Sequence, residues 1–446
     1  MWVKFDVISS DRDVIYLPDS LSERIDKNTT IRFGGCVCEN PTILYTDVIE
    51  PREGSSYQNP VKIMISDKLR KQLLLPESLV YRVRITNSHI LIGPVIGLLL
   101  GIHTQHYNPE HMRKYSDRLG IYDKIGGLIF AFSPKSVNWE AHTAFGLYYN
   151  IATSEWEYGC FPLPEVIYRR DFHSNPEDIK KLFRYTGGRL FNSYRFTKMD
   201  LYNYLSLDEE LKRLLPATEL SLNFEQVKKF IERYPKVIFK PIDLSRGRGI
   251  CVIEKVDSAY KITDYRNRYP ITSYLHGQYS LEDYFNQNQD FFNKYLIQRY
   301  LNLARIENSP FDIRVVMQKT KGKIWSCTGI ECRVSSDNSH ITNISRGGYA
   351  LTLQEALRQS YKKDYDTLPA KINDYCLKFC NQMDKMDQHF AEFGMDIAVD
   401  VNKTIWLIEA NVFPSFKGFK SMDRRTYRSI RYTPLLYALS LTPFGE

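Results

Sequence analysis

The stretch of this chain that most limits its fold is a pair of apolar segments near the C-terminus that carry three oxygen-bearing side chains. The first segment contains Asp396, and the second, residues 407–411, contains Glu409 and Asn411. Side chains alternate between the two faces of a strand, so Glu409 and Asn411 point to the same side. A hairpin with its turn at residues 402–403 sets Asp396 opposite Glu409. We therefore expect the three side chains to converge on one face.

The other face of this hairpin is predicted to be apolar. The positions expected there are Ile397, Val399, Trp406 and Ile408. Carboxylates in such a hairpin are costly unless something cationic lies between them. Oxygen ligands of this kind suit Mg²⁺, which is typically bound by one or two carboxylates and substrate phosphates. The hairpin therefore indicates a magnesium site, and the alternatives are an edge carboxylate pair with lysines or a solvated hairpin face.

Length and charge limit the class of protein. A chain of 446 residues indicates two or three domains. The formal net charge of +8 fits the binding of an anion such as a nucleotide or an acidic substrate. Nucleic-acid binding is not expected, because the basic residues are diffuse. The one modest cluster is Arg424, Arg425, Arg428 and Arg431.

The cysteines, histidines and apolar runs indicate a soluble protein without a zinc site. The eight cysteines lack paired zinc spacing, so we expect reduced, packed thiols in a cytosolic protein. The irregular spacing of His103, His106 and His111 favours loop histidines over a metal site. The N-terminus lacks the apolar core of a signal peptide. The longest apolar run, residues 90–102, is too short to span a bilayer.

Residues 1–93 read as short strands separated by turns. Strands are expected at residues 14–17, 30–33, 62–65 and 81–85. This pattern predicts a small β-rich module, for which a barrel is one arrangement.

Residues 94–190 combine strands with helices, which predicts a small α/β domain. The strands are expected at residues 127–132 and 143–149, and the helical segments at 109–119 and 176–184. The residues that indicate chemistry all lie after residue 190.

A glycine loop joins two predicted strands, and its residues include Ser245, Gly247 and Gly249. Glycines let the backbone adopt positive φ and approach a ligand closely. Successive backbone N–H groups in such a loop form an anion-binding concavity. Lys240, at the end of the first strand, adds a charge suited to a phosphate. The alternative is a hairpin turn with basic surface residues, and the loop is not a Walker loop because no Gly-Lys-Ser/Thr opens a helix.

Two more strands are expected at residues 295–301 and 311–317. Plain sheet is the favoured interpretation of both. Asp312 and Arg314 nevertheless share one face of the second strand, which is costly to bury without a ligand or partner.

A group of arginines follows these strands. Arg333 and Arg346 are suited to clamp negative charge that develops on a transferred phosphoryl group. Asn343 and a Gly-Gly pair accompany Arg346. The alternative for residues 345–348 is a loop that leads into an amphipathic helix expected at residues 353–360.

Taken in order, these motifs resemble the ATP-grasp superfamily over residues 192–444. Each motif is loose, but their order along the chain is specific. The Asp-x-Arg of residues 312–314, the Asn-x-x-Arg-Gly-Gly of residues 343–348 and the Asp396 hairpin are most similar to the branch of ribosomal-protein glutamate ligases and glutathione synthetases.

Nearly the whole chain also resembles a narrower group, the YheC/YheD family of endospore-coat-associated proteins. The segments that carry this resemblance are residues 8–13, 15–18, 93–97, 164–170 and 215–218. The resemblance implies a spore-forming source and names no reaction. The fold class expected is a multidomain α+β and α/β protein. Its parts are an N-terminal β-rich module (1–93), a small α/β pre-ATP-grasp domain (94–190) and a C-terminal ATP-grasp domain (191–446).

The ATP-grasp resemblance implies which residues contact the phosphates of ATP. Lys198 and Lys240 would bind the phosphates, and the loop with Ser245, Gly247 and Gly249 would close over them. Lys198 follows a threonine where an Asp-Lys pair is common in the superfamily.

The same resemblance implies an adenosine site. Gln298 and the backbone of Tyr300 and Leu301 would hold adenine, and Asp312 would bind the ribose hydroxyls. Gln298 replaces a frequent glutamate, but its amide oxygen can still accept a hydrogen bond from the adenine amine.

For catalysis, the resemblance implies that Arg333, Asn343 and Arg346 face the γ-phosphate and the acyl phosphate. The ligands implied for two Mg²⁺ ions are Asp396, Glu409 and Asn411. Residues 412–415 lack a glycine that is usual near the acceptor site, which leaves the acceptor open.

The expected function is an ATP- and Mg²⁺-dependent ligase that joins a carboxylate to an amine or thiol through an acyl phosphate. It would act in the cytoplasm or in association with the spore coat, with ATP, the two substrates and coat proteins as partners and no membrane span. The alternatives are an ATP-binding structural or coat-associated protein without turnover, and an ATP-grasp phosphotransferase with a hydroxyl acceptor.

Overall fold

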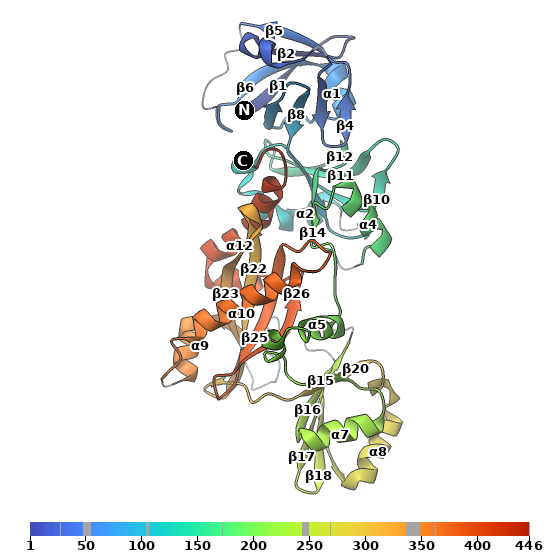
Figure 1. Cartoon of the computed structure of the whole chain (residues 1–446), viewed down its shortest axis with the longest axis vertical. Coiled ribbons are helices and arrows are strands. Elements are labelled where there is room, and N and C mark those ends of the chain that lie inside the picture. Colours follow the sequence, from blue (N-terminus) through green and yellow to red (C-terminus); the bar gives the residue numbers. More distant parts are fainter. Residues whose placement is uncertain are drawn as a thin grey trace.

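The computed structural model describes the chain except for residues 27, 48–54, 104–106, 172, 243–248, 268, 336–347, 362 and 446. Its strands form four sheets that lie one after another along the longest axis of the molecule (Figure 1). The order along the axis differs from the order along the chain. The fourth sheet, orange in Figure 1, lies between the second sheet and the third, so the third sheet is at one end.

The first sheet has eight strands in the order β4-β3-β8-β7-β1-β6-β2-β5. The four strands predicted in this region are confirmed as β2, β3, β6 and β7. The barrel arrangement is wrong, because the edge strands β4 and β5 are not paired with each other in the described residues. The elements are β1 (Trp2–Ile8), β2 (Val14–Pro18), η1 (Asp19–Arg24), β3 (Thr30–Phe33), β4 (Cys36–Cys38), β5 (Thr42–Thr46), β6 (Val61–Ser66), α1 (Asp67–Leu73), β7 (Tyr81–Ile85) and β8 (His89–Gly93).

The second sheet has six strands in the order β12-β11-β10-β9-β13-β14. All five residues of the strand β9 are buried. A parallel strand that is covered on both faces is apolar at every position, so its sequence is a continuous apolar run. This explains the apolar run at residues 90–102. The elements are β9 (Val95–Leu99), α2 (Pro109–Ser116), η3 (Asp117–Leu119), α3 (Tyr122–Ile125), β10 (Leu128–Asn138), β11 (Thr143–Asn150), β12 (Glu155–Pro162), β13 (Val166–Arg169), α4 (Pro176–Tyr185) and β14 (Leu190–Phe191).

The third sheet, with the order β15-β20-β16-β17-β18-β19, packs helices α7 and α8 around a core of its own. Helix α5 precedes it and begins with a capping box formed by Thr197 and Asp200. The elements are α5 (Lys198–Leu205), α6 (Glu209–Lys212), β15 (Thr218–Leu220), α7 (Phe224–Arg233), β16 (Lys236–Pro241), β17 (Cys251–Val256), β18 (Ala259–Asp264), β19 (Ile271–His276), α8 (Gly277–Gln287), η4 (Gln289–Phe291) and β20 (Tyr295–Arg299).

The fourth sheet has the order β24-β23-β22-β25-β26, with β21 paired to β22. One face carries an apolar core that includes residues of α5, α9 and α10. The amphipathic helix predicted at residues 353–360 is confirmed as α9. The elements are β21 (Arg305–Ile306), β22 (Ser309–Thr320), η5 (Lys321–Lys323), β23 (Ile324–Val334), β24 (Tyr349–Leu351), α9 (Leu353–Ser360), α10 (Leu368–Met383), β25 (Glu392–Val399), β26 (Ile405–Asn411), α11 (Lys417–Met422) and α12 (Arg424–Ser440).

Helix α12 ties the fourth sheet to the first two. Ile430 packs with Val316 of β22, whereas Leu435 and Tyr437 belong to the core shared by the first and second sheets. The guanidinium group of Arg82 donates to the carbonyl of Phe444 over 2.8 Å. The C-terminal segment therefore spans the junction between the sheets.

Two simpler features also concern the chain as a whole. The eight cysteines are free thiols. Among the residues that the structure describes, no helix has both the length and the hydrophobicity that a membrane crossing requires.

Candidate functional site

The face of the fourth sheet opposite its apolar core carries a layer of charged side chains. The strand β22 lies between β23 and β25, and Arg314 has Glu331 and Asp396 as its cross-strand partners. Asp312 lies opposite Arg333 in the same way. Because cross-strand partners share a face, the pairing alone brings these five side chains together.

Two arginines and two aspartates in this layer form a continuous ladder. Arg314 binds Asp396 through two contacts, with Nε to Oδ1 at 2.6 Å and Nη2 to Oδ2 at 3.1 Å. Arg333 binds Asp312 through Nε at 2.7 Å and Nη2 at 2.5 Å, and its Nη2 also lies 3.0 Å from Asp396 Oδ1. Burial acts to raise the pKa of Asp396, but Arg314 and Arg333 outweigh it and hold that pKa below its usual value.

The hairpin β25–β26 has the predicted register at its charged positions. Asp396 pairs with Glu409, and Gly394 pairs with Asn411. A bulge follows, because the next residue, Ile397, pairs with Leu407 and leaves Ile408 without a cross-strand partner.

This bulge corrects the expected apolar face. Ile397 and Val399 face the core as predicted, but Trp406 and Ile408 do not join them. The core positions of β26 before the bulge are Ile405 and Leu407, and those after it are Ala410 and Val412. One extra residue reverses the alternation, so Glu409 and Asn411 point away from a core that a regular strand would have forced them into.

The side chains of Glu409 and Asn411 have no hydrogen-bond partner among the described residues. Both are half-buried. Burial and the neighbouring Asp396 raise the pKa of Glu409, while Lys198 and Lys240 act in the opposite direction. A carboxylate and an amide oxygen that bind nothing in the described part of the chain are thus available to a ligand.

Lys198 and Lys240 face Glu409 from the side of the third sheet. Lys198 is the first residue of α5, and its Nζ donates to the carbonyl of Pro241 over 3.1 Å. Lys240 lies in β16, and its Nζ donates to Gln298 Oε1 over 2.6 Å. Burial and Lys198 lower the pKa of Lys240 to about 8, although Glu409 opposes the change. A desolvated ammonium group with a second one near it forms a place where an anion is favoured.

The residues implied for adenine lie beside this lysine pair. The amide of Gln298 accepts from Lys240 and donates through Nε2 to Thr218 Oγ1 over 2.7 Å. The backbone N–H of Tyr300 donates to the carbonyl of Lys236, and the carbonyl of Leu301 accepts from a backbone N–H two residues on. Their role in binding adenine stays a prediction.

Several residues implied by the sequence fall outside the described part of the chain. Ser245, Gly247, Asn343 and Arg346 belong to this group. Gly249 is described and has a φ of +72°, a conformation for which glycine is suited.

The histidine motif does not form a metal site in the described residues. The ring of His103 lies 5.8 Å from the ring of His173, and His111 contacts Lys114, whereas His106 is outside the described residues. The described chain contains no cluster of three His, Cys, Asp or Glu side chains suited to a metal ion.

Glu331 is a member of the charged layer that the sequence did not single out. It is 2% exposed, and its Oε2 has no hydrogen-bond partner in the part of the chain that the structure describes. Burial raises the pKa of Glu331 to about 7, against the pull of Arg314 and Arg333. The alternation of Glu331 and Arg333 in the sequence was the available signal, since period two in a strand places both on one face.

The far end of the charged layer is closed by close packing of α11 and α12. A Cβ on Gly329 would lie 2.6 Å from Ile430 Cδ1, and a Cβ on Gly394 would lie 2.4 Å from Pro414 Cβ. Arg314 Nη1 also donates to the carbonyl of Ser415 over 3.3 Å. The segment that follows Asn411 is therefore fixed against both the sheet and its arginine.

The residues present fit a divalent cation and a phosphate chain. Around the site, Asp312, Glu331, Asp396 and Glu409 contribute carboxyl groups, and Lys198, Lys240, Arg314 and Arg333 contribute basic groups. The oxygens of Glu409 and Asn411 suit a hard cation such as Mg²⁺. Within the described residues, Asp396 Oδ2 accepts from Arg314 alone, which leaves it a lone pair for a cation.

The fold and this site define an ATP-grasp protein. A family model for YheC/D-like ATP-grasp proteins matches residues 187–441. The chain belongs to the YheC/D-like ATP-grasp family.

Relatives of known sequence carry the same family name. The endospore coat-associated protein YheD of Bacillus subtilis is 27% identical over 404 residues, which cover 85% of this chain and 87% of the relative. The endospore coat-associated protein YheC of the same organism is 22% identical over 334 residues, covering 73% and 92%. Among solved structures, N5-carboxyaminoimidazole synthetase from Staphylococcus aureus, complexed with ADP, is 11% identical with a TM-score of 0.45 and 79% coverage of each chain.

Proposed function

We propose that this protein is an ATP- and Mg²⁺-dependent ligase that activates a carboxylate as an acyl phosphate and transfers the acyl group to an amine or a thiol. One observation carries the proposal. The charges of Lys198 and Lys240 act on the carboxylate of Glu409, in a chain of an ATP-grasp family. A nucleotide that carries Mg²⁺ on its phosphates fits such a site, because the lysines suit the phosphates and the oxygens of the hairpin suit the cation.

In this proposal, Lys198 and Lys240 bind the phosphates of ATP. Lys240 then exchanges its hydrogen bond with Gln298 for a phosphate oxygen. The exchange frees Gln298 Oε1 to accept a hydrogen bond from the adenine amine. The backbone of residues 300–301 would bind adenine as well. Asp312 would bind the ribose, and the loop with Ser245, Gly247 and Gly249 would cover the phosphates.

Asp396, Glu409 and Asn411 would hold Mg²⁺, which neutralises phosphate charge when it is bound. Arg314 keeps Asp396 ionised and oriented through its two contacts. The bulge at Ile408 directs Glu409 and Asn411 toward the same space.

The chemistry follows from these positions. An oxygen of the substrate carboxylate attacks the γ-phosphorus, and the bond to the leaving oxygen of ADP breaks. Arg333, with Asn343 and Arg346, stabilises the negative charge on the transferred phosphoryl group. The amine then attacks the acyl carbon, phosphate leaves, and the proton lost by the amine passes to phosphate or water.

We propose that the enzyme acts in the cytoplasm of a spore-forming bacterium or in association with its spore coat. Its partners would then be coat proteins. The names of the two curated relatives, both endospore coat-associated proteins, support this part of the proposal.

The test is turnover that requires an acid. Purified protein with Mg²⁺-ATP and a panel of carboxylic acids is expected to release ADP and phosphate, and added hydroxylamine should yield the acyl hydroxamate of the accepted acid. Glu409→Gln should lose this activity, whereas the matched variant Glu225→Gln, on an exposed position of α7, should keep it. ATP binding without turnover across a broad panel contradicts the ligase. A phosphorylated product that persists without amine indicates a phosphotransferase instead.

A further inference from the structure

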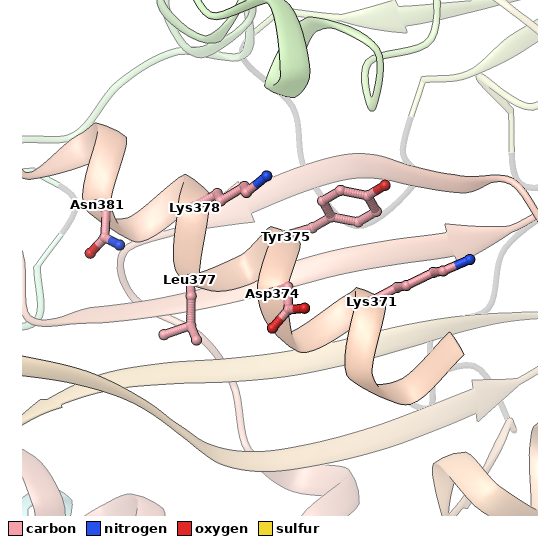
Figure 2. A pocket seen from close by; sticks show the side chains of 6 residues that line it. All are labelled: Lys371, Asp374, Tyr375, Leu377, Lys378 and Asn381. Atoms are coloured by element: carbon pink, nitrogen blue, oxygen red, sulfur yellow. The ribbon is translucent and has the colours of Figure 1, made fainter. Parts of the chain in front are cut away.

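Two surface hollows lie on helices of the ATP-grasp region, away from the charged face. The first, on α10, has a volume of about 380 Å³ and is shown in Figure 2. Lys371, Tyr375 and Lys378 extend from one side of the helix in that view. Asp374 lies among the lysines, and Lys378 is ion-paired with Glu210, so the charges here are mixed.

The second hollow, on α12, is larger and carries one sign of charge. Its volume is about 550 Å³. The residues that line it are Ile121, Arg424, Arg425, Arg428, Ser429, Tyr432, Thr433 and Leu436. Three of them are exposed arginines, and none is acidic. This group of residues is called the α12 hollow below.

The fold makes little use of these three arginine side chains, although the charge of Arg425 acts on the neighbouring Asp423. The guanidinium groups of Arg424, Arg425 and Arg428 take part in no ion pair or hydrogen bond among the described residues. Arg431, one turn further along the same helix, differs, because it binds Asp117 and the carbonyl of Lys114. The structural role on α12 therefore belongs to Arg431.

Their position also makes the arginines unfavourable for the isolated helix. Arg424 and Arg425 lie in the first turn of α12, directly after the N-cap residue Asp423, whose carboxylate accepts from the backbone N–H of Arg425. The positive end of the helix dipole disfavours cations there. Exposed arginines without an ion pair in the described part of the chain are suited to bind an anion outside the fold.

The other half of the α12 hollow is apolar. Ile121 and Tyr432 lie beside Leu436, whose side chain is 36% exposed. Arg424, Arg428, Tyr432 and Leu436 are spaced four residues apart, so they form one row along the helix, each about 6 Å from the next. The row changes from guanidinium groups to apolar groups over about three turns.

We infer that the α12 hollow docks an acidic segment of a partner protein, with carboxylates on the arginines and an apolar side chain on Tyr432 and Leu436. The positive charge of the arginines favours a partner with a negatively charged surface. The apolar half favours a polypeptide over a nucleic acid, because a polypeptide can present carboxylates and aliphatic side chains together. A site for a nucleic acid would instead have basic residues that follow the phosphate backbone. This inference does not depend on the proposed ligase activity.

The test uses a fluorescein-labelled peptide of Asp, Glu and Leu residues, titrated with the full chain at low salt. Binding is expected to weaken as salt is added, because exposed charges are screened. Arg424→Glu/Arg428→Glu should weaken binding at least tenfold. The control Lys371→Glu/Lys385→Glu makes the same change in net charge on exposed positions in and just after α10 and should leave binding within twofold. Leu436→Ser, which alters no charge, should also weaken binding.

Four results would overturn the inference. The first is absence of binding at low salt. The second is equal binding by both double variants, which would place the peptide elsewhere. The third is preference for single-stranded DNA or anionic vesicles through the same arginines, and the fourth is self-association of the chain that Arg424→Glu/Arg428→Glu abolishes. Unchanged thermal unfolding of each variant shows that a loss of binding is not a loss of fold.

Discussion

Lys240 gives a quantitative test of the lysine pair that we assign to the phosphates of ATP. Burial and Lys198 lower the pKa of Lys240 to about 8, so about half of the ammonium groups are protonated at pH 8. A bound phosphate would return the pKa toward its usual 10.5 and leave nearly all of them protonated. Each nucleotide bound at pH 8 should therefore take up about half a proton.

The assay is isothermal titration calorimetry with ADP in two buffers of different ionisation enthalpy. Mg²⁺ is left out, because a cation at Glu409 would release protons and mask the effect. The slope of observed enthalpy against buffer ionisation enthalpy gives the protons taken up. Lys240→Met should bind ADP more weakly and show almost no uptake. An equal slope for the wild type and Lys240→Met, or no buffer dependence at pH 8 in the wild type, would refute the placement of phosphates on Lys240.

The same lysine affects stability in the absence of nucleotide. A lysine whose folded pKa is lowered from 10.5 to about 8 destabilises the fold below pH 8, by up to about 3 kcal/mol. That penalty disappears as pH rises from about 8 to 10.5, since the unfolded chain then loses its proton too. Thermal unfolding of Lys240→Met at pH 7 should thus occur at or above the wild-type temperature, so a loss of ADP binding cannot be ascribed to unfolding.

Three further substitutions test the charged face. Asp396→Asn leaves two buried arginines without their shared anion and should destabilise the protein by about 3–5 kcal/mol. The double variant with Arg314→Met should recover part of that loss. A single variant whose stability lies within about 1 kcal/mol of wild type, the scale of an exposed ion pair, would contradict the ladder. Glu331→Gln should stabilise the ligand-free protein above pH 7 by up to about 3 kcal/mol. The gain should vanish as pH falls to about 4.5, because a raised carboxyl pKa costs stability only where the carboxyl group of the unfolded chain is ionised. A variant that is less stable than wild type at pH 8 would argue against a raised pKa. Gly329→Ala places a Cβ 2.6 Å from Ile430 Cδ1 and should lower the unfolding temperature by several degrees in differential scanning calorimetry; an unchanged temperature would mean that α12 packs less tightly on the sheet.

Local patterns in the sequence predicted much of the fold and part of the site. Strands such as residues 81–85 and the helix at residues 353–360 were predictable, because periodicity and capping residues are local. The pairing of Asp396 with Glu409 was predictable for the same reason, since a short hairpin turn fixes the register.

The rest of the site depends on contacts between distant residues. The ladder of Asp312, Arg333, Asp396 and Arg314 needs the order in which β23, β22 and β25 pair, and no local pattern specifies it. The bulge at Ile408 was missed because one extra residue leaves the composition of a strand unchanged while it reverses the faces. Burial, which alternation alone does not reveal, explains why Glu331 escaped notice.

The central claim is that nucleotide and Mg²⁺ bind between the lysine pair and the hairpin. A crystal structure of the protein with a non-hydrolysable ATP analogue and Mg²⁺ tests it most directly. We expect the phosphates on Lys198 and Lys240 and the cation on Glu409 and Asn411, with Asp396 still held by Arg314. A nucleotide bound elsewhere, or a cation on other ligands while Glu409 stays free, would contradict the claim.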